Sequence, residues 1–219
     1  MKRQYLGDSK DSFKWDYLHF LVEQLGYSQL KIAWMMTPDD NGPDGRTLPE
    51  WFPAREEILQ FCNNLRSTHD PALLSGLPAT TAARYAVSLH TPEGLNGGNR
   101  DSYFSCIESG PDQVLFLDPD NGFEPELIFS EKHVLYSEVD RIIRTMSPGS
   151  VVTVFQHHRR KKFPHDFARI REHLESGYSA AIYWHSLMFV SVSPSPEIIN
   201  RLCEVNREYA RLRPVEALV

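Results

Sequence analysis

Two carboxylates and an amide follow a run of apolar residues near the middle of the chain. Residues 114–117 are Val-Leu-Phe-Leu, and residues 118–122 are Asp-Pro-Asp-Asn-Gly, a cluster that favours a turn. A strand buried on both faces and followed by a polar turn is typical of a ligand site, because open α/β sheets bind ligands at the carboxyl ends of their strands. We therefore take this turn as the candidate functional site. The alternative is a turn whose carboxylates bond only nearby backbone N–H groups.

Metal binding is one chemistry that this turn could support. Asp118, Asp120 and Glu124 carry hard oxygen atoms of the kind that Mg²⁺ and Ca²⁺ prefer. With His157 or His158 nearby, they would form the site of a metal-dependent phosphodiesterase or nuclease. In the metal-free alternative, Asp118 orients a reacting group and stabilises the charge that develops on it.

A second polar turn follows the apolar residues 151–155. It contains His157 and His158 and then four consecutive cations at residues 159–162. Adjacent histidines point to opposite sides of a strand, so one of them at most faces the site, where it could act as a general base. The cations, among them Arg159 and Arg160, predict contacts with phosphate groups. The alternative is a solvated basic turn.

Composition indicates one ordinary globular α/β domain over residues 1–219. The 219 residues are 41% hydrophobic and 24% charged. Residues 66–81 contain Pro and Ser and are interpreted as a possible insertion within that domain. The net charge of -6 argues against a protein that coats nucleic acid, so any contact with nucleic acid would use a local basic patch.

The sequence also predicts a cytoplasmic protein without a membrane partner. No apolar stretch approaches the roughly 20 residues that a membrane span needs, and the first residues lack the apolar segment of a signal peptide. Cys62, Cys106 and Cys203 are far apart and lie among apolar residues. They are therefore expected to be reduced, mostly buried thiols.

The elements that position these residues follow from hydrophobic periodicity. Strands are expected at residues 30–36, 84–89, 114–117, 151–155, 180–183 and 187–192. Helices are expected within residues 5–26 and at 54–65, 101–107, 132–146, 164–174 and 196–213. The alternation predicts a doubly wound, mostly parallel sheet, with an antiparallel closing strand supplied by the last hairpin.

Four short motifs, spread over most of the chain, resemble one enzyme family. They are Gly7-Asp8-x-x-Asp11-x-x-Lys14, Ser-Leu-His-Thr-Pro at residues 88–92, Phe-Leu-Asp-Pro at residues 116–119, and Phe-Val-Ser-Val-Ser-Pro at residues 189–194. In bacterial large-subunit ribosomal RNA adenine-N6 methyltransferases, the corresponding motifs are Gly-Asn-x-x-Asp-x-x-Lys, Glu-Leu-His-Pro, the start of Asp-Pro-Pro-Tyr, and the last strand. The chain resembles more loosely the partner protein of three-cysteine-motif systems.

This resemblance implies a methyltransferase-like, mostly parallel seven-stranded sheet, with S-adenosylmethionine as the methyl donor. The implied donor site consists of Lys14, Thr37, Asp39, His90 and Asp101. The implied catalytic residues are Asp118, Pro119, Asn121 and His157. The implied substrate and phosphate contacts are Phe123, which would offer an aromatic face, and His158, Arg159 and Arg160.

The chain departs from the family motifs at three places. Asp120 and Asn121 replace the second proline and the tyrosine of Asp-Pro-Pro-Tyr, and Ser88 stands where an acid is expected. A loop rich in acid, Gly and Pro, residues 37–46, replaces the glycine-rich loop after the first strand, and no Gly-x-Gly-x-x-Gly is present. A catalytically inactive partner protein with this fold is therefore a further alternative.

Overall fold

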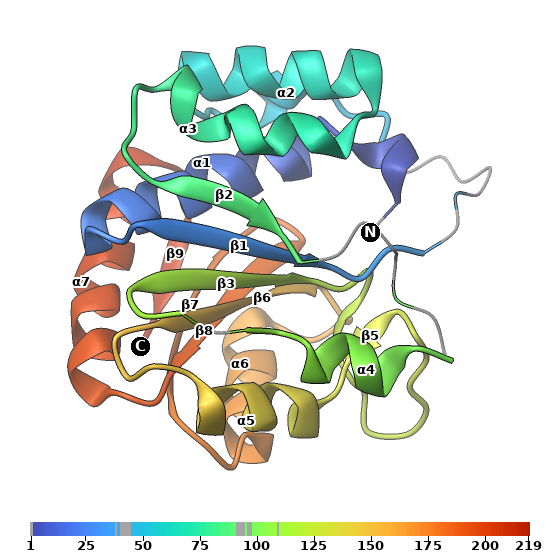
Figure 1. The fold of residues 1–219 in the computed structure, drawn as a ribbon, viewed down its shortest axis with the longest axis vertical. Helices are drawn as coiled ribbons and strands as arrows, with labels where there is room; N and C mark the ends of the chain where they lie inside the picture. The colour runs from blue at the N-terminus through green and yellow to red at the C-terminus, as the bar shows by residue number, and fades with distance from the viewer. Residues whose placement is uncertain (1, 38, 40–44, 91–94, 96–97, 109) are drawn as a thin grey trace.

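A mixed sheet of seven strands runs through the middle of the protein, with helices on both faces (Figure 1). This computed structural model describes residues 2–37, 39, 45–90, 95, 98–108 and 110–219. The strands in spatial order are β2 (Ala86–Leu89), β1 (Gln29–Trp34), β3 (Gln113–Asp118), β6 (Val151–His157), β8 (Leu187–Ser193), β7 (Tyr178–Trp184) and β9 (Glu216–Leu218).

The sheet is mostly parallel, as predicted, but its reversed strands differ from the prediction. β1, β2, β3 and β6 pair in parallel, whereas β8 pairs antiparallel with both β6 and β7. The antiparallel strand of the hairpin therefore lies inside the sheet and does not close it. The edge is formed by β9, which pairs antiparallel with β7 and was not predicted. Its three residues are too few to show a periodic pattern.

Helices form one layer on each face of the sheet (Figure 1). On one side, α1 (Ser9–Leu25) and α7 (Pro196–Leu212) pack on the strands, with α2 (Glu56–Thr68) next to α1. On the other side lie α4 (Arg100–Ser105), α5 (Tyr136–Thr145) and α6 (Phe163–His173). The short elements are 3-10 turns at Arg3–Tyr5, Pro49–Trp51 and Pro71–Gly76, α3 (Leu77–Thr80), and a separate parallel pair, β4 (Gly122–Phe123) and β5 (His133–Val134).

Alternation along β3 decides which layer each side chain meets. Val114 and Phe116 pack in the core beneath α1 and α7, whereas Leu115 and Leu117 pack beneath α5 and α6. Because successive side chains of a strand point to opposite faces, the next residue, Asp118, is directed toward α1. The central strand thus carries its carboxylate to the helix at the start of the chain.

α1 begins at Ser9, inside the predicted range of residues 5–26. Gly7 has φ +79°, a left-handed conformation that ends the preceding turn, and the Asp8 carboxylate accepts hydrogen bonds from the backbone N–H groups of Lys10 and Asp11. Gly26, with φ 68°, ends the helix as predicted. Nearly every side chain between these ends is buried, so α1 is a central helix and not a surface one.

The segment interpreted as an insertion, residues 66–81, adds to the main core. It comprises the end of α2, the turn at Pro71–Gly76 and α3. Leu74 and Leu77 are fully buried in the same cluster as the side chains of α1. The three cysteines are free, with Cys106 exposed and the other two buried. Across the described ranges, no helix combines the length and the apolar character that crossing a membrane requires.

Replacing Phe189 by alanine should destabilise the fold strongly. Phe189 on β8 is 0% exposed, and its ring centroid lies 4.9 Å from that of Phe13 and 5.2 Å from that of Tyr17. Removing a buried aromatic ring costs about 3–5 kcal/mol of unfolding free energy, measured by urea denaturation. Phe129→Ala is the matched control, because Phe129 is 54% exposed and its removal should change stability by about 0.5 kcal/mol or less. Equal midpoints for the two variants would contradict the packing of β8.

Candidate functional site

The candidate site at the carboxyl edge of the sheet is centred on a buried ion pair. Lys14 Nζ lies 2.9 Å from Asp118 Oδ2 and 3.0 Å from Asp11 Oδ1. Asp11 and Lys14 are one turn apart on α1, so both face the end of β3. Asp118 is the last residue of β3 and only 1% exposed. The ion pair therefore joins α1 to the central strand.

Burial and charge act against each other in this pair. Burial lowers the pKa of Lys14, but the Asp11 and Asp118 carboxylates outweigh burial and raise it above its usual value. Burial raises the pKa of Asp118, and the Lys14 ammonium opposes that rise. Lys14 therefore stays protonated at neutral pH and provides the positive charge that a buried carboxylate needs.

A small polar pocket of about 40 Å³ opens beside the ion pair. A water molecule occupies roughly 30 Å³ in the liquid, so the pocket admits a group of that size and not a nucleoside. The lining residues are Tyr5, Asp8, Lys10, Asp11, Lys14, Asp118, Pro119, Asp120, Phe155 and His157.

Asp8 is a buried acid in the pocket that keeps one unused acceptor. Its Oδ1 caps α1, whereas its Oδ2 is buried and has no hydrogen-bond partner among the described residues. Burial, helped by the negative charge of Asp11, raises the pKa of Asp8 to about 6. The sequence interpretation treated Asp8 and Asp11 only as helix caps and motif positions. The i, i+3 spacing of Asp8, Asp11 and Lys14 is the signal that could have placed all three on one helix face.

His157 faces the pocket as a neutral imidazole. It ends β6 on the same side as Phe155, and burial together with the positive charges of Lys10 and Lys14 lowers its pKa to about 3. His158 points the other way, is exposed, and lies against Phe163. The structure thus places one histidine at the site, and that histidine carries no charge with which to hold phosphate at neutral pH.

The turn after Asp118 is divided between the pocket and the surface. Pro119 lines the pocket, and Asp120 Oδ2 accepts a hydrogen bond of 2.8 Å from the Thr37 hydroxyl. Asn121 is exposed, and its side-chain nitrogen lies 3.4 Å from His133 Nε2. Of the four predicted catalytic residues, the structure brings together Asp118, Pro119 and His157, whereas Asn121 does not line the pocket.

Phe123 cannot offer its ring to a substrate base in this structure, contrary to the prediction. Its side chain is 0% exposed and stacks on Tyr136, with ring centroids 5.2 Å apart and planes 20° apart. Its backbone N–H donates to Gln156 Oε1 over 2.9 Å. Phe123 belongs to the hydrophobic core because β4 folds back against the end of β6.

The predicted phosphate-binding cations have different surroundings. The Arg159 guanidinium donates to the carbonyl oxygens of Phe123 and Glu124 and to Gln156 Oε1. It therefore stabilises the segment that follows Asp118 against the end of β6. Arg160 is exposed in a left-handed turn with φ 60°. Its side chain, unlike that of Arg159, is directed to solvent.

The three candidate metal ligands do not converge. Asp118 pairs with Lys14, Asp120 accepts from Thr37, and Glu124 Oε1 accepts from the Tyr136 backbone N–H over 2.8 Å. Among the residues that the structure describes, no group of three His, Cys, Asp or Glu side chains is placed to hold a metal ion.

Of the predicted donor-site residues, Thr37 and Asp39 follow β1 and His90 follows β2, whereas Lys14 alone lines the pocket. Asp39 Oδ1 accepts from the Gln4 backbone N–H over 3.3 Å, His90 Nε2 lies 2.8 Å from the Tyr103 carbonyl oxygen, and Asp101 is exposed on α4. Burial lowers the pKa of His90. Residues 38, 40–44 and 91–94, which belong to the two predicted donor loops, lie outside the described residues.

Comparison with known proteins does not assign a family. No family model and no curated protein matches the chain. Among solved structures, human methyltransferase-like protein 13 in complex with SAH aligns over 93% of this chain and 90% of that chain, with 12% sequence identity and a TM-score of 0.42. A likeness at this level does not bear on the fold or the activity of the present chain.

Lys14→Met should destabilise the protein in a manner that depends on pH. The substitution leaves the buried Asp11 and Asp118 carboxylates without their cation, which costs about 3–5 kcal/mol at neutral pH. The folded-state pKa of Asp118 then lies further above its unfolded value, so the variant should regain stability as the pH falls from 7.5 toward 5. Urea unfolding at several pH values measures both effects.

Lys10→Met is the control for this prediction. Lys10 lines the same pocket from the same helix but is half-buried. Its removal should cost about 1 kcal/mol or less. A Lys14→Met variant as stable as Lys10→Met at neutral pH would show that the ion pair is not buried.

His157 should make the protein less stable in acid. Its pKa is about 3 in the folded protein and 6.5 in the unfolded chain, so the unfolded chain takes up a proton first as the pH falls. The stability that His157 contributes is complete above about pH 6.5 and is lost between that pH and about 3. His157→Gln should therefore flatten the decline of the melting temperature between pH 7 and 4.5.

His158→Gln changes the exposed neighbour of His157. This variant should show the same decline of melting temperature with falling pH as the parent protein. The comparison between variants is needed because other groups titrate in this window. The pKa of His19 is lowered by burial to about 4, which adds to the decline, whereas the raised pKa of Asp8 opposes it. Equal slopes of melting temperature against pH for both histidine variants would contradict a neutral, half-buried His157.

Proposed function

We propose that the protein is an S-adenosylmethionine-dependent methyltransferase that acts on an amino group of a nucleic-acid base or a base-like substrate. The observation that carries this proposal is the Asp118-Pro119 pair, placed at the end of the central strand and beside a water-sized pocket. The layout of the sheet supports it. The sheet has seven strands and is mostly parallel, which is the layout that the resemblance to methyltransferases implies.

The pocket fits an exocyclic amine better than a whole base. At about 40 Å³ it has room for a group the size of water, so the ring of the acceptor would remain outside. The Asp118 carboxylate and the Pro119 carbonyl oxygen would accept the two N–H groups and turn the nitrogen lone pair toward the methyl group. Lys14 keeps the Asp118 carboxylate ionised, and that carboxylate stabilises the positive charge that grows on the nitrogen.

The described residues fit the amino-acid end of the donor. When bound, the donor supplies an electrophilic methyl group. Asp8 Oδ2, a buried acceptor without a partner among the described residues, suits an ammonium group, and Lys10 in the same pocket suits a carboxylate. Because the pocket of about 40 Å³ has room for one group the size of water, it must widen for the donor and the acceptor amine to be present together. The nucleoside would lie over the loops that follow β1 and β2, where Thr37 and His90 are the nearest described residues.

A second candidate is a catalytically inactive member of this fold that serves as a partner in a multi-protein system. The specific observation in its favour is the closed state of the site. Asp118 is 1% exposed and already bonded to Lys14, and Phe123 is buried where the family places an aromatic ring for the base. The two candidates differ in whether the donor binds.

Thermal-shift titrations with S-adenosylmethionine and S-adenosylhomocysteine, each with and without Mg²⁺, test the proposal. A ligand at about 100 times its dissociation constant stabilises a protein by about 2.7 kcal/mol, which raises the melting temperature of a chain of this size by about 5–10 °C. Both nucleosides should give such a shift without Mg²⁺, and Asp8→Asn should reduce it. No shift with either nucleoside would support the inactive candidate, and a shift with Mg²⁺ alone would support a metal-dependent enzyme.

Asp118→Asn then separates binding from catalysis. The variant should keep the donor-induced shift but transfer labelled methyl groups to a single-stranded adenine-rich RNA at least about 100-fold more slowly, because the amide cannot stabilise the charge on the amine. Asp112→Asn, at the other end of the same strand, is the matched control and should transfer normally. Equal rates in the two variants would rule out the role given to Asp118.

A further inference from the structure

Three bulky apolar side chains in a row are exposed to solvent close to the candidate site. Leu127, Ile128 and Phe129 are 93%, 82% and 54% exposed and lie in the segment that joins β4 to β5. We call these three residues the apolar loop. Figure 1 shows β5 at the edge of the sheet where β1 and β2 end. A run of exposed apolar residues is costly in water, and in natural proteins it typically marks a surface that contacts a partner.

The apolar loop has a well-defined stem that reaches the pocket. β4 and β5 pair in parallel on either side of it. Directly after the loop, the Ser130 backbone N–H donates to His133 Nδ1 over 3.1 Å. Lys132 Nζ lies 4.0 Å from Asp120 Oδ2, and Asp120 belongs to the lining of the pocket. The structure therefore presents the three apolar side chains on a support that is joined to the candidate site.

A basic turn lies beside the apolar loop. It consists of Arg160, Lys161 and Lys162, which are all exposed and which join β6 to α6. Lys161 Nζ lies 3.1 Å from Oε1 of Glu126, the residue before the apolar loop. The basic turn and the apolar loop are therefore neighbours in space, although 35 positions separate Lys161 from Glu126 in the sequence.

Apolar side chains beside exposed cations suit a polyanion that also offers apolar surface. A nucleic-acid helix is such a partner, because proteins insert Leu, Ile and Phe side chains between its stacked bases and place cations on its phosphates. An anionic membrane has the same two properties. The position of the two segments favours nucleic acid, since both lie around a pocket whose proposed role is to hold the amine of a base. In this choice of partner, the inference rests on the proposed function.

A paired base would need to be freed before it could react. One N–H of an exocyclic amine bonds the partner base within a base pair, whereas the roles given to Asp118 and Pro119 use both N–H groups. Enzymes that modify a base in a duplex therefore take it out of the stack, and a group inserted in its place lowers the cost of doing so.

We propose that the apolar loop and the basic turn bind double-stranded nucleic acid and free the target base. The apolar side chains insert between stacked bases beside the target, and the basic turn binds the phosphates. The displaced base then has its amine free to reach Asp118. A base that is already unpaired needs no insertion, so the apolar loop distinguishes duplex from single-stranded substrates.

Fluorescence anisotropy with a labelled hairpin, made as DNA and as RNA, and with the corresponding unpaired strands tests this inference. The double variant L127S/I128S should bind the hairpin about tenfold more weakly, because serine side chains cannot replace a base in the stack. Its affinity for the single strands should equal that of the parent protein. Both side chains are largely exposed, so the melting temperature should not change. Equal hairpin affinities of the parent and the variant would overturn the proposal.

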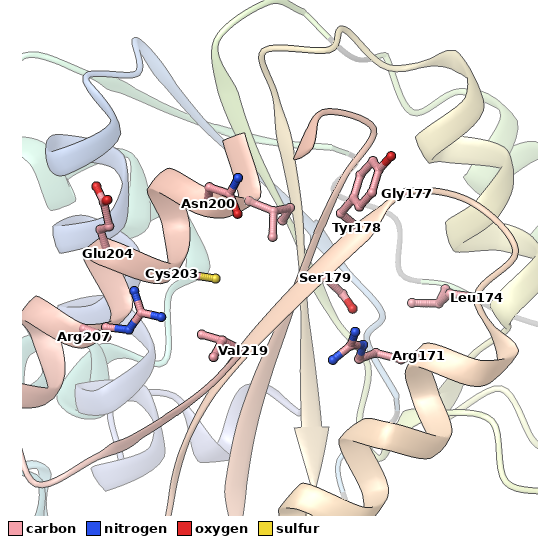
Figure 2. Close-up of a pocket in the computed structure, with 11 residues that line it drawn as sticks. Arg171, Leu174, Gly177, Tyr178, Ser179, Asn200, Cys203, Glu204, Arg207 and Val219 are labelled. Atoms are coloured by element: carbon pink, nitrogen blue, oxygen red, sulfur yellow. The ribbon is translucent and has the colours of Figure 1, made fainter. Parts of the chain in front are cut away.

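The salt dependence of binding tests the basic turn. The double variant R160Q/K162Q should bind both hairpin and single strand more weakly and should lower the slope of log affinity against log salt concentration by about 2. R171Q/R207Q is the matched control, because it removes the same charge beside the start of β7, where Figure 2 shows both arginines. This control should keep the slope of the parent protein. Equal slopes for the two double variants would contradict phosphate binding by the basic turn.

A hairpin with 2-aminopurine next to the target base measures insertion directly, since its fluorescence rises when stacking is lost. The parent protein should raise the fluorescence and L127S/I128S should not. These measurements use no methyl donor, so unstacking by a protein that does not bind S-adenosylmethionine would contradict the proposed function and support this inference. Donor binding without unstacking would do the reverse. Loop-dependent binding to phosphatidylserine vesicles in place of the hairpin would identify a membrane surface and overturn the inference.

Discussion

The buried ammonium of Lys14 is the interaction on which the site and much of the fold depend. A lysine charge taken out of water is costly, and in this protein it is compensated by Asp11 on its own helix and by Asp118 at the end of the central strand. These contacts specify the rotation and the height of α1 on the sheet, because a shift of one residue would separate Lys14 from Asp118 and leave the Asp118 carboxylate buried and unpaired. The apolar faces of α1 could pack in several ways, since nearly all of that helix is buried. The ion pair therefore contributes specificity more than net stability.

The electrostatics of the rest of the site follow from that placement. With Lys14 and Lys10 on the same helix face, His157 at the end of β6 remains neutral, with a pKa near 3. Asp8 lies close to Asp11 and has its pKa raised to about 6. The result is a pocket whose charges are in place before any ligand arrives. Such fixed charges suit a reaction in which positive charge develops on an amine, because little rearrangement is then needed in the transition state.

The sequence predicted those features of the site that follow from the regular alternation of side chains along a strand. It missed the features that depend on contacts between distant segments of the chain. The buried run before Asp118, the polar edge after it, and the opposite directions of His157 and His158 all follow from the two-residue period of strands. Phe123 was misplaced because β4 has two residues and no periodic signal. Its burial depends on Gln156, and on Gly122, whose φ is 102° and where a Cβ would collide with the Gln156 side chain. Arg159 looked like a free cation because its backbone acceptors lie more than thirty residues away.

The two edges of the sheet differ in how their charged side chains and backbone polar groups are paired. At the carboxyl end, the buried charges of Asp11, Lys14 and Asp118 pair with one another, and one oxygen of Asp8 has no hydrogen-bond partner among the described residues. At the other end, β9 pairs with β7 at residues 181–183, and two arginines without acidic partners among the described residues remain in contact with solvent. Because β8 is reversed, β7 runs in the same direction as β3, so its first residues lie at the edge of the sheet away from Asp118. Any influence between the two would have to pass through β8, the strand that pairs with both β6 and β7.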